Sequence, residues 1–169
     1  MQTFDTIMTR RSVRQFDTKR PISQKEIHTL LEAAFAAPSA MNKRPWQFLV
    51  VTDVQMLEQI RQTHPYAQFV LDAGCAIIIV ADKSACYEEY WRVDPLLAGE
   101  NILLAARDIG LGTCWCGVYP NEERMCEMKH LFDIPEPFEP MALIVVGTPL
   151  QEQVKLNRYQ ADKVHLNKW

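Results

Sequence analysis

The chain has 169 residues, of which 48% are hydrophobic and 23% charged, and its formal net charge is -3. This is the composition of a globular protein, and we expect one domain over residues 1–169 with a substantial core. The mild acidity and the lack of a basic stripe argue against nucleic-acid binding, and no apolar run is long enough to span a membrane. The five cysteines lack regular spacing, which predicts reduced thiols, and the start lacks a signal-peptide pattern, so we expect a cytoplasmic protein.

Hydrophobic periodicity predicts helices and strands that alternate along the first half of the chain. Ser23 and Glu26 form the pattern of a capping box, which opens a helix, and Pro38 disfavours helical geometry in the residue before it. We expect a short helix over 4–9, a longer helix over 24–37 and a loop over 38–45. A strand over 46–52, a helix over 54–63 and a buried strand over 75–81 follow.

In the second half, the predicted helix over 95–109 is apolar almost all round, which is typical of a helix buried in a core or an interface. Gly110 ends this helix. After it we expect a strand over 113–119, a helix over 121–132 that is capped by Asn121, a last strand over 141–146 and a polar tail over 149–169. The alternation predicts a sheet with helices on its faces, and it leaves open whether the strands run parallel or antiparallel.

Three arginines crowd into the segment after the first predicted helix, at Arg10, Arg11 and Arg14, with Ser12 among them. Guanidinium groups keep their charge at ordinary pH, and their planar forks suit the oxygens of phosphate or carboxylate. Like charges this close repel one another unless an anion lies between them. The segment therefore predicts an anion site, and the alternative is a solvated basic turn.

The glycine-rich run 110–117 has the composition of a dinucleotide-binding loop. Such a loop follows a strand and opens a helix, whereas this run follows a helix and becomes a strand. We therefore reject a dinucleotide fold here. The glycines still permit a ligand or another element to approach the backbone closely.

The cysteines near this run suggest a metal site, because Cys126 and His130 lie four residues apart on a helix. A strand, however, puts Cys114 and Cys116 on one side with Trp115 opposite, and no pair has zinc-finger spacing. Buried thiols that pack as small hydrophobic groups are the favoured interpretation, and we predict no metal.

No serine lies in a nucleophile elbow, and the acids Asp94 and Glu100 at the buried helix have no obvious catalytic partner. An anion site without acid–base machinery suggests that a bound cofactor supplies the chemistry.

Three motifs in order resemble the FMN-dependent nitroreductase family. This family has an R-x-S-x-[RK]-x-[FY] opening, an A-P-S-[SA]-x-N-x-Q-P-W loop and a G-L-G-x-x-W segment. The corresponding stretches here are 10–16, 37–46 and 110–115, and a family-like end over 146–149 precedes Lys155 and Arg158. Arg44 stands where the family often has glutamine.

The resemblance implies an α+β fold, a mostly antiparallel mixed sheet flanked by helices. It implies a homodimer with two FMN sites at the subunit interface and a C-terminal extension, here residues 149–169, exchanged between subunits. The chain is shorter than the larger members of the family, which leaves the roof of the pocket undefined.

The resemblance also implies a cofactor-binding set drawn from four parts of the chain. The opening residues would hold the phosphate, the ribityl chain and the pyrimidine edge, and the loop would reach the ring from the partner chain. The glycine-rich segment would lie along the isoalloxazine, and the tail would complete the phosphate clamp. These residues are Arg10, Arg11, Ser12 and Arg14; Pro38, Ser39, Ala40 and Asn42; Trp115, Cys116 and Gly117; and Lys155 and Arg158.

The implied function is FMN-dependent oxidoreduction. A hydride would pass from NAD(P)H through flavin N5 to a nitroaromatic, a quinone or a similar electrophile by a ping-pong mechanism, with no catalytic side chain. One alternative is a flavin-binding protein without turnover, such as a store, a sensor or a partner in flavin degradation. Another is a flavin-free interaction module. The physiological oxidant, the choice between NADH and NADPH and any role of the cysteines stay open.

Overall fold

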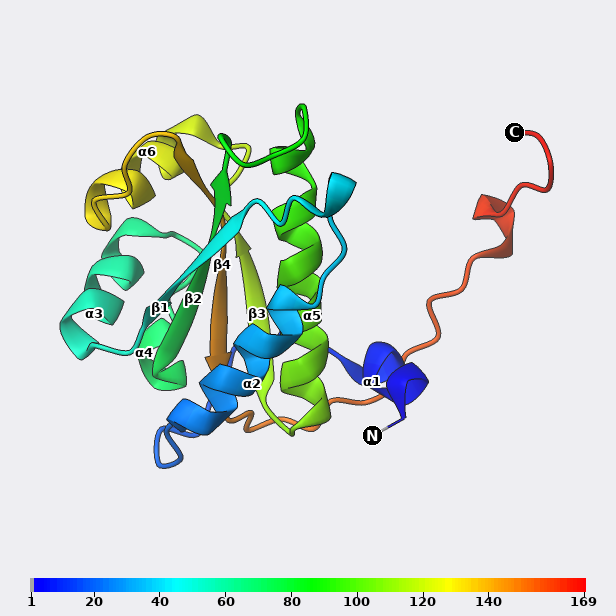
Figure 1. The fold of residues 1–169 in the computed structure, drawn as a ribbon. Coiled ribbons are helices and arrows are strands. Elements are labelled where there is room, and N and C mark those ends of the chain that lie inside the picture. The colour runs from blue at the N-terminus through cyan, green and yellow to red at the C-terminus, as the bar shows by residue number, and fades with distance from the viewer. Residues whose placement is uncertain (1) are drawn as a thin grey trace.

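A computed structural model describes residues 2–169. Its centre is an antiparallel sheet of four strands in the order β1-β2-β4-β3, which lies between two layers of helices (Figure 1). The strands are β1 (Trp46–Val51), β2 (Cys75–Asp82), β3 (Gly112–Gly117) and β4 (Phe138–Gly147). In the described chain, the pairing of Ser12 with Thr113 is a single parallel bridge outside these strands. The predicted α+β fold with a mostly antiparallel sheet is confirmed.

The described residues contain six α-helices, of which all but the first form the two layers on the sheet. They are α1 (Thr3–Thr9), α2 (Gln24–Phe35), α3 (Val54–Thr63), α4 (Val70–Ala73), α5 (Asp94–Asp108) and α6 (Glu122–Leu131). The short 3-10 turns are Ala40–Asn42, Tyr90–Arg92 and Ala161–Lys163. The capping box at Ser23 and Glu26 is present, which confirms the predicted start of α2. Among residues 2–169, no helix has the length and apolar character needed to cross a bilayer.

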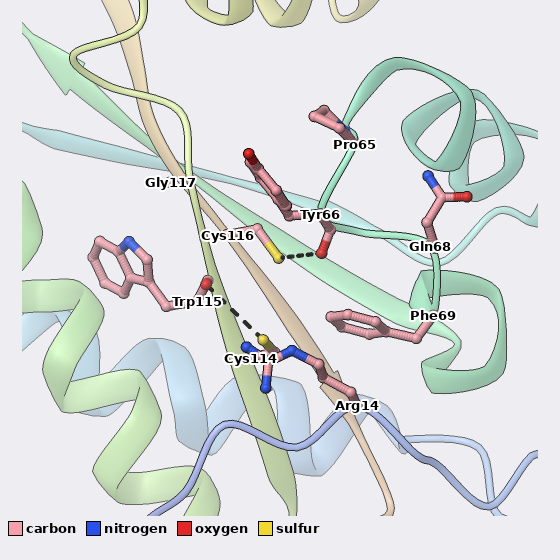
Figure 2. A pocket seen from close by; sticks show the side chains of 9 residues that line it. All are labelled: Arg14, Pro65, Tyr66, Gln68, Phe69, Cys114, Trp115, Cys116 and Gly117. Carbon is pink, nitrogen blue, oxygen red and sulfur yellow. Dashed lines mark hydrogen bonds between the residues drawn. The ribbon is translucent and has the colours of Figure 1, made fainter.

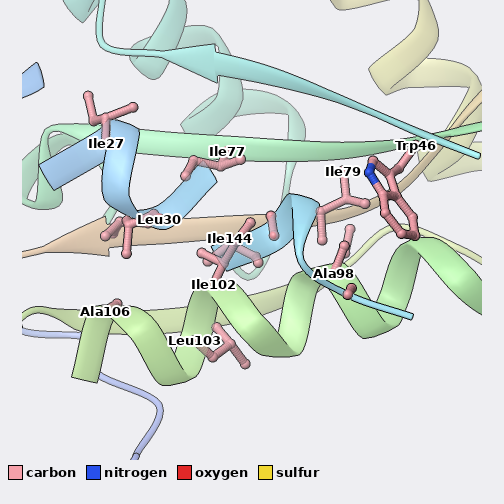
Figure 3. Close-up of a cluster of buried hydrophobic side chains, with 14 of the residues drawn as sticks. Ile27, Leu30, Trp46, Ile77, Ile79, Ala98, Ile102, Leu103, Ala106 and Ile144 are labelled. Carbon is pink, nitrogen blue, oxygen red and sulfur yellow. The ribbon is translucent and has the colours of Figure 1, made fainter. Parts of the chain in front are cut away.

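The helices α2 and α5 cover one face of the sheet. Their buried side chains, among them Leu30, Ile102 and Ala106, pack on Ile77 and Ile144 of the strands (Figure 3). This packing explains why the α5 sequence is apolar almost all round, because the helix contacts both the sheet and the neighbouring α2.

The helices α3, α4 and α6 cover the other face, where Leu57, Val70 and Met128 pack with Ile78 and Leu143. The strand β2 is buried on both faces, since its odd-numbered side chains belong to the first core and its even-numbered side chains to the second. A strand buried on both faces needs an unbroken apolar run rather than an alternating one.

Two elements end elsewhere than predicted. The strand β3 ends at Gly117, because the amides of Val118 and Tyr119 both donate to the carbonyl of Met141 and the regular ladder stops there. The strand β4 begins earlier, at Phe138, because its first residues pair with the end of β2 beyond an irregularity between Ile79 and Val80.

The C-terminal residues leave the body of the fold (Figure 1). Gln153 is buried, whereas all residues from 154 to 169 are exposed. The Gln153 side chain accepts a hydrogen bond from the amide of Arg11 and donates to the carbonyl of Leu111, at 3.3 and 3.2 Å. We call residues 154–169 the arm, and Gln153 anchors it.

Candidate functional site

The segment 10–14, which we call the basic segment, runs beside the outer edge of β3. The amide of Val13 donates to the carbonyl of Thr113 at 2.8 Å, and Ser12 pairs with Thr113. The basic segment follows α1, whose last turn ends at Thr9. The fold therefore brings the predicted anion-binding segment next to the predicted glycine-rich segment, 100 residues further along the chain.

The outer edge of β3 offers unpaired backbone groups beyond Thr113. In an antiparallel strand the amide and the carbonyl of one residue point to the same edge of the strand, and every second residue repeats this direction. Because the Thr113 carbonyl turns away from β4, the amides of Trp115 and Gly117 turn outward too. The Gly117 carbonyl confirms this direction, because its hydrogen-bond donors are His64 and Arg124, outside the sheet. A Cβ at Gly117 would meet no atom within 4 Å, so this end of β3 is open.

A cavity of about 390 Å³ lies over this end of β3 (Figure 2). Its lining includes four residues of the predicted set, namely Arg14, Trp115, Cys116 and Gly117. The indole of Trp115 points away from the cavity, toward α5, so Trp115 contributes its backbone (Figure 2). A Cβ on Gly99 would lie 2.5 Å from this indole, which shows how closely the ring packs on α5.

The facing wall of the cavity is a segment that the sequence analysis did not single out. Residues 65–69 connect α3 to α4 and contribute Pro65, Tyr66, Gln68 and Phe69. Their sequence has no motif, although two aromatic residues in a connection of five residues are a weak signal of a binding wall.

His64 and Arg124 hold the Gly117 carbonyl from two directions. The Nδ1 atom of His64 accepts from the amide of Tyr66 at 3.3 Å, so Nε2 carries the proton and donates to Gly117 at 3.2 Å. Arg124 donates to the same oxygen at 2.6 Å and lies over the Tyr66 ring, 5.4 Å from its centroid. Burial lowers the pKa of His64, which is fully buried, and the nearby Arg124 charge lowers it further.

A second feature, a cluster of arginines, lies at the start of β3. Burial lowers the pKa of the Arg11 guanidinium, and the charges of three neighbouring arginines lower it further. The Nε and Nη2 atoms of Arg11 are buried and have no hydrogen-bond partner. Unpaired buried donors on a charged group are costly, so they fit an anionic ligand that would accept from them. The basic cluster consists of Arg10, Arg11, Arg107 and Arg158.

The neighbours of Arg11 differ in how they are held. The Arg10 guanidinium lies 3.7 Å from the Glu100 carboxylate. Arg107 donates to the hydroxyl of Thr9 and to the carbonyl of Gln153. Lys155 lies over the ring of Phe4 in α1, at 5.5 Å, and like Arg158 is exposed on the arm. The structure thus brings arginines from the start and the end of the chain together, with Arg11 rather than Arg10 at their centre.

The loop with Pro38, Ser39, Ala40 and Asn42 does not line the cavity of its own chain. The buried carboxylate of Asp94, at the start of α5, accepts from the amide of Ala40 at 3.0 Å and holds the loop beside that helix end. This contact gives Asp94 a structural role. Any contact of the loop with a ligand in the cavity would have to come from a second copy of the chain.

The cysteines do not form a metal cluster with acids or histidines. Within residues 2–169, no three side chains of His, Cys, Asp or Glu lie close enough together to hold a metal ion. Cys114 and Cys116 are buried in β3, whereas Cys126 is exposed on α6.

Comparison with known proteins decides the family. The model of the nitroreductase family matches residues 7–64 and 58–148. A protein of Methanothermobacter thermautotrophicus, provisionally named NADH dehydrogenase/NAD(P)H nitroreductase, is 41% identical over 170 residues and aligns over 100% of this chain and 88% of its own. The chain belongs to the nitroreductase family.

Solved structures of nitroreductase-family proteins have the same fold. A Parabacteroides distasonis protein with the same provisional name superposes with a TM-score of 0.95 at 34% identity, over 100% of this chain and 99% of that one. An FMN-dependent nitroreductase from Clostridium difficile R20291 gives a TM-score of 0.90 at 27% identity, over 98% and 99% of the two chains. The match extends over almost the whole length of each nitroreductase, including the edge of β3.

Proposed function

We propose that the chain binds FMN along the outer edge of β3 and is an FMN-dependent oxidoreductase. It would take a hydride from NAD(P)H and pass it to a nitroaromatic, a quinone or a similar electrophile in a ping-pong cycle. One observation carries the proposal: a cluster of arginines with unpaired donors lies at one end of this edge, and an open cavity with outward amides lies at the other. FMN has the matching shape, with a phosphate at one end and a flat ring at the other.

The basic cluster would hold the phosphate. A phosphate monoester carries a charge of about -1.5 to -2 at neutral pH, and it accepts several charge-assisted hydrogen bonds. Arg11 would supply its two unpaired donors, and Arg10 and Arg158 would add charge, with Lys155 further out on the arm. Ser12, next to Thr113 at the middle of the edge, would face the ribityl chain.

The cavity would hold the ring. When bound, FMN supplies an atom, N5, that accepts a hydride and gives it up again, so the chain needs no nucleophile of its own. Gly117 and Trp115 present outward amides toward the ring, and the Arg14 guanidinium lines the same cavity. A cation at the pyrimidine edge stabilises negative charge on that edge and favours the reduced state. Tyr66 and Phe69 would exclude water from the facing side.

The names of relatives support the same chemistry. The Methanothermobacter thermautotrophicus protein is named for NADH dehydrogenase and NAD(P)H nitroreductase activity, and the Clostridium difficile structure is described as FMN-dependent. We infer a nicotinamide donor and an FMN cofactor for this chain from those names together with the arrangement of its own residues.

We also propose that two chains form a homodimer, each a single domain of residues 1–169 with residues 149–169 exchanged. The arm exposes Leu166 and Trp169, at 84% and 101%, and such large apolar groups favour a covered position. The partner's loop would then bring Pro38, Ser39, Ala40 and Asn42 to the ring. Light scattering should give twice the chain mass of 19.5 kDa, and deletion of residues 154–169 should give a monomer. A full-length monomer at micromolar concentration would contradict the dimer.

The absorbance spectrum of the purified protein tests the flavin. We expect a yellow protein whose released chromophore is FMN and whose colour is bleached anaerobically by NADH or NADPH. Steady oxidation of the nicotinamide by a nitroaromatic or a quinone separates the enzyme from a flavin store or sensor, which would bind FMN without turnover. A colourless protein whose melting temperature does not change on addition of FMN would favour the flavin-free interaction module.

A further inference from the structure

Two thiols lie side by side in the floor of the cavity. Cys114 and Cys116 are two residues apart in β3, so both side chains leave the strand on the face that carries α3, α4 and α6. Both belong to the lining of the cavity, although only 1% and 2% of the side chains are exposed. Figure 2 shows both sulfur atoms on the side away from the indole of Trp115, toward Tyr66 and Arg14.

The other described thiols are separated from this pair. Cys75 faces the opposite core, with α2 and α5, so the sheet lies between it and the pair. Cys126 is exposed on α6, and the thiol of Cys86 donates to the carbonyls of Lys83 and Glu88 in the turn after β2. The pair in β3 is therefore the one place in residues 2–169 where two thiols could share one atom.

The surroundings of the pair favour loss of a thiol proton. The contact with the Cys116 thiol lowers the pKa of Cys114, and the positive charge of Arg14 lowers it further. The same contact, together with burial, raises the pKa of Cys116, whose thiol donates to the Tyr66 carbonyl at 3.3 Å. By contrast, burial alone raises the pKa of Cys75 to about 12. A thiolate is the form that attacks electrophiles and soft metal centres.

We propose that Cys114 and Cys116 form a dithiol site for trivalent arsenic, bound through both sulfur atoms. An organic arsenoxide, R–As=O, would form two As–S bonds and lose its oxygen, which leaves as water with the two thiol protons. No oxidant or reductant takes part, because arsenic stays trivalent throughout. The arsenic would lie in the floor of the cavity between Tyr66 and Arg14.

The proposal has a consequence for the proposed function but does not depend on it. If FMN occupies the cavity, its ring covers the two sulfur atoms, and arsenic and flavin compete. If FMN binds elsewhere or not at all, the thiol pair is still present in β3.

Phenylarsine oxide tests the site on the full-length chain, followed by intact-mass spectrometry. After loading, excess 2-mercaptoethanol removes arsenic from single thiols, and 2,3-dimercaptopropanol removes it from pairs. We expect one phenylarsenic group per chain that survives the first reagent and is lost with the second. Cys114→Ser and Cys116→Ser should each lower the retained fraction at least tenfold, whereas Cys126→Ser should leave it unchanged. No retained group on the wild-type chain, or full retention in both serine variants, would overturn the proposal.

A measurement on the wild-type chain makes the test independent of how the serine variants fold. N-ethylmaleimide applied in denaturant after arsenic, followed by peptide mapping, should find Cys114 and Cys116 blocked together and Cys126 labelled, whereas all three are labelled in the arsenic-free chain. Chains in which only one of the two cysteines is protected by arsenic would contradict the dithiol site. Loading in the presence of FMN separates the two proposals. If FMN binds but does not slow the loading of arsenic, the proposed position of the flavin is contradicted and the dithiol site is not. If FMN binds and no arsenic is retained even without FMN, the dithiol site is contradicted and the flavin site is not.

Discussion

The Nε2 atom of His64 lies 3.2 Å from the carbonyl oxygen of Gly117, 53 residues further along the chain. This bond joins the end of α3 to the end of β3, the two walls of the cavity. Arg124 of α6 donates to the same oxygen. Gly117 has no side chain to fix its position, so its backbone orientation at the cavity depends on donors from two other elements.

Replacing His64 with leucine should therefore destabilise the protein. The change removes one donor to Gly117 and leaves the amide of Tyr66 without its acceptor, which together should cost about 1–3 kcal/mol. Urea unfolding followed by fluorescence measures the loss. His28→Leu is the control, because His28 is exposed on α2 and should change the free energy of unfolding by less than about 0.5 kcal/mol. Equal unfolding midpoints for the two variants would contradict the bridging role of His64.

The same histidine predicts a dependence of stability on pH. Burial lowers the pKa of His64 in the folded protein, whereas in the unfolded chain the pKa is near 6.5. Below pH 6.5 the His64 imidazole binds a proton in the unfolded chain but stays neutral in the folded chain. The free energy of unfolding therefore falls as the pH decreases. This contribution is fully present above pH 6.5 and is lost on acidification, at up to about 1.4 kcal/mol per pH unit.

Subtraction of the His64→Leu curve isolates this effect from the carboxylates. The stability difference between the wild-type protein and the variant should shrink from pH 7.5 to pH 5. Parallel curves over this range would show that the His64 pKa is the same in both states.

Arg11→Met should change ligand binding and apoprotein stability in opposite directions. The variant removes a half-buried charge that lies among other arginines and has two buried, unpaired donor atoms, so the flavin-free chain should unfold at equal or higher temperature. Loss of a charged hydrogen bond should weaken FMN binding by about 1.5–3 kcal/mol, which is roughly 10- to 150-fold in Kd. Fluorescence titration and thermal unfolding measure the two effects.

Arg92→Met is the matched control, because Arg92 is exposed and lies next to Glu89, outside the basic cluster. Neither its Kd for FMN nor its flavin-free stability should change. If Arg11→Met behaves in the same way, the arginine cluster is not the phosphate site.

Gly99→Ala tests the packing behind the cavity. The added methyl group would lie 2.5 Å from both the Ile79 side chain and the Trp115 ring, so a shift of one of them is unavoidable. Overpacking of this kind costs about 1–3 kcal/mol. A second change, Trp115→Phe, provides a smaller ring, and the double variant should recover part of the loss. Calorimetry of both variants gives the comparison, and an unperturbed Gly99→Ala protein would show that the indole moves freely.

The sequence predicted the main elements well where local signals were strong. The capping box at Ser23, the apolar run of β2 and the glycine after α5 each have a local physical cause, and the corresponding elements lie close to their predicted positions. The hydrophobic pattern left the strand direction open, because a strand buried on both faces looks the same in parallel and antiparallel sheets, and only the family resemblance predicted the antiparallel arrangement.

The candidate site was predicted in part. The motifs pointed to Arg14 and to the end of β3, which together line the cavity. The facing wall at Tyr66 and Phe69 carries no motif, and its role depends on the distant contact between His64 and Gly117. The central position of Arg11 could not be predicted either, because adjacent arginines look alike in a sequence until the fold shows which one has other arginines around it and donors without a partner.

The anchor at Gln153 ties the arm to the arginine cluster. Its side chain accepts a hydrogen bond from the Arg11 amide, and its carbonyl accepts one from Arg107, so two residues of the basic cluster contact the residue from which the arm starts. Two equilibria that share contacts are thermodynamically linked, and each must shift the other by the same factor. The rate at which a protease cuts residues 154–169 would then depend on whether a ligand is bound to the basic cluster. Pulling on the C-terminus would in turn weaken the binding of that ligand.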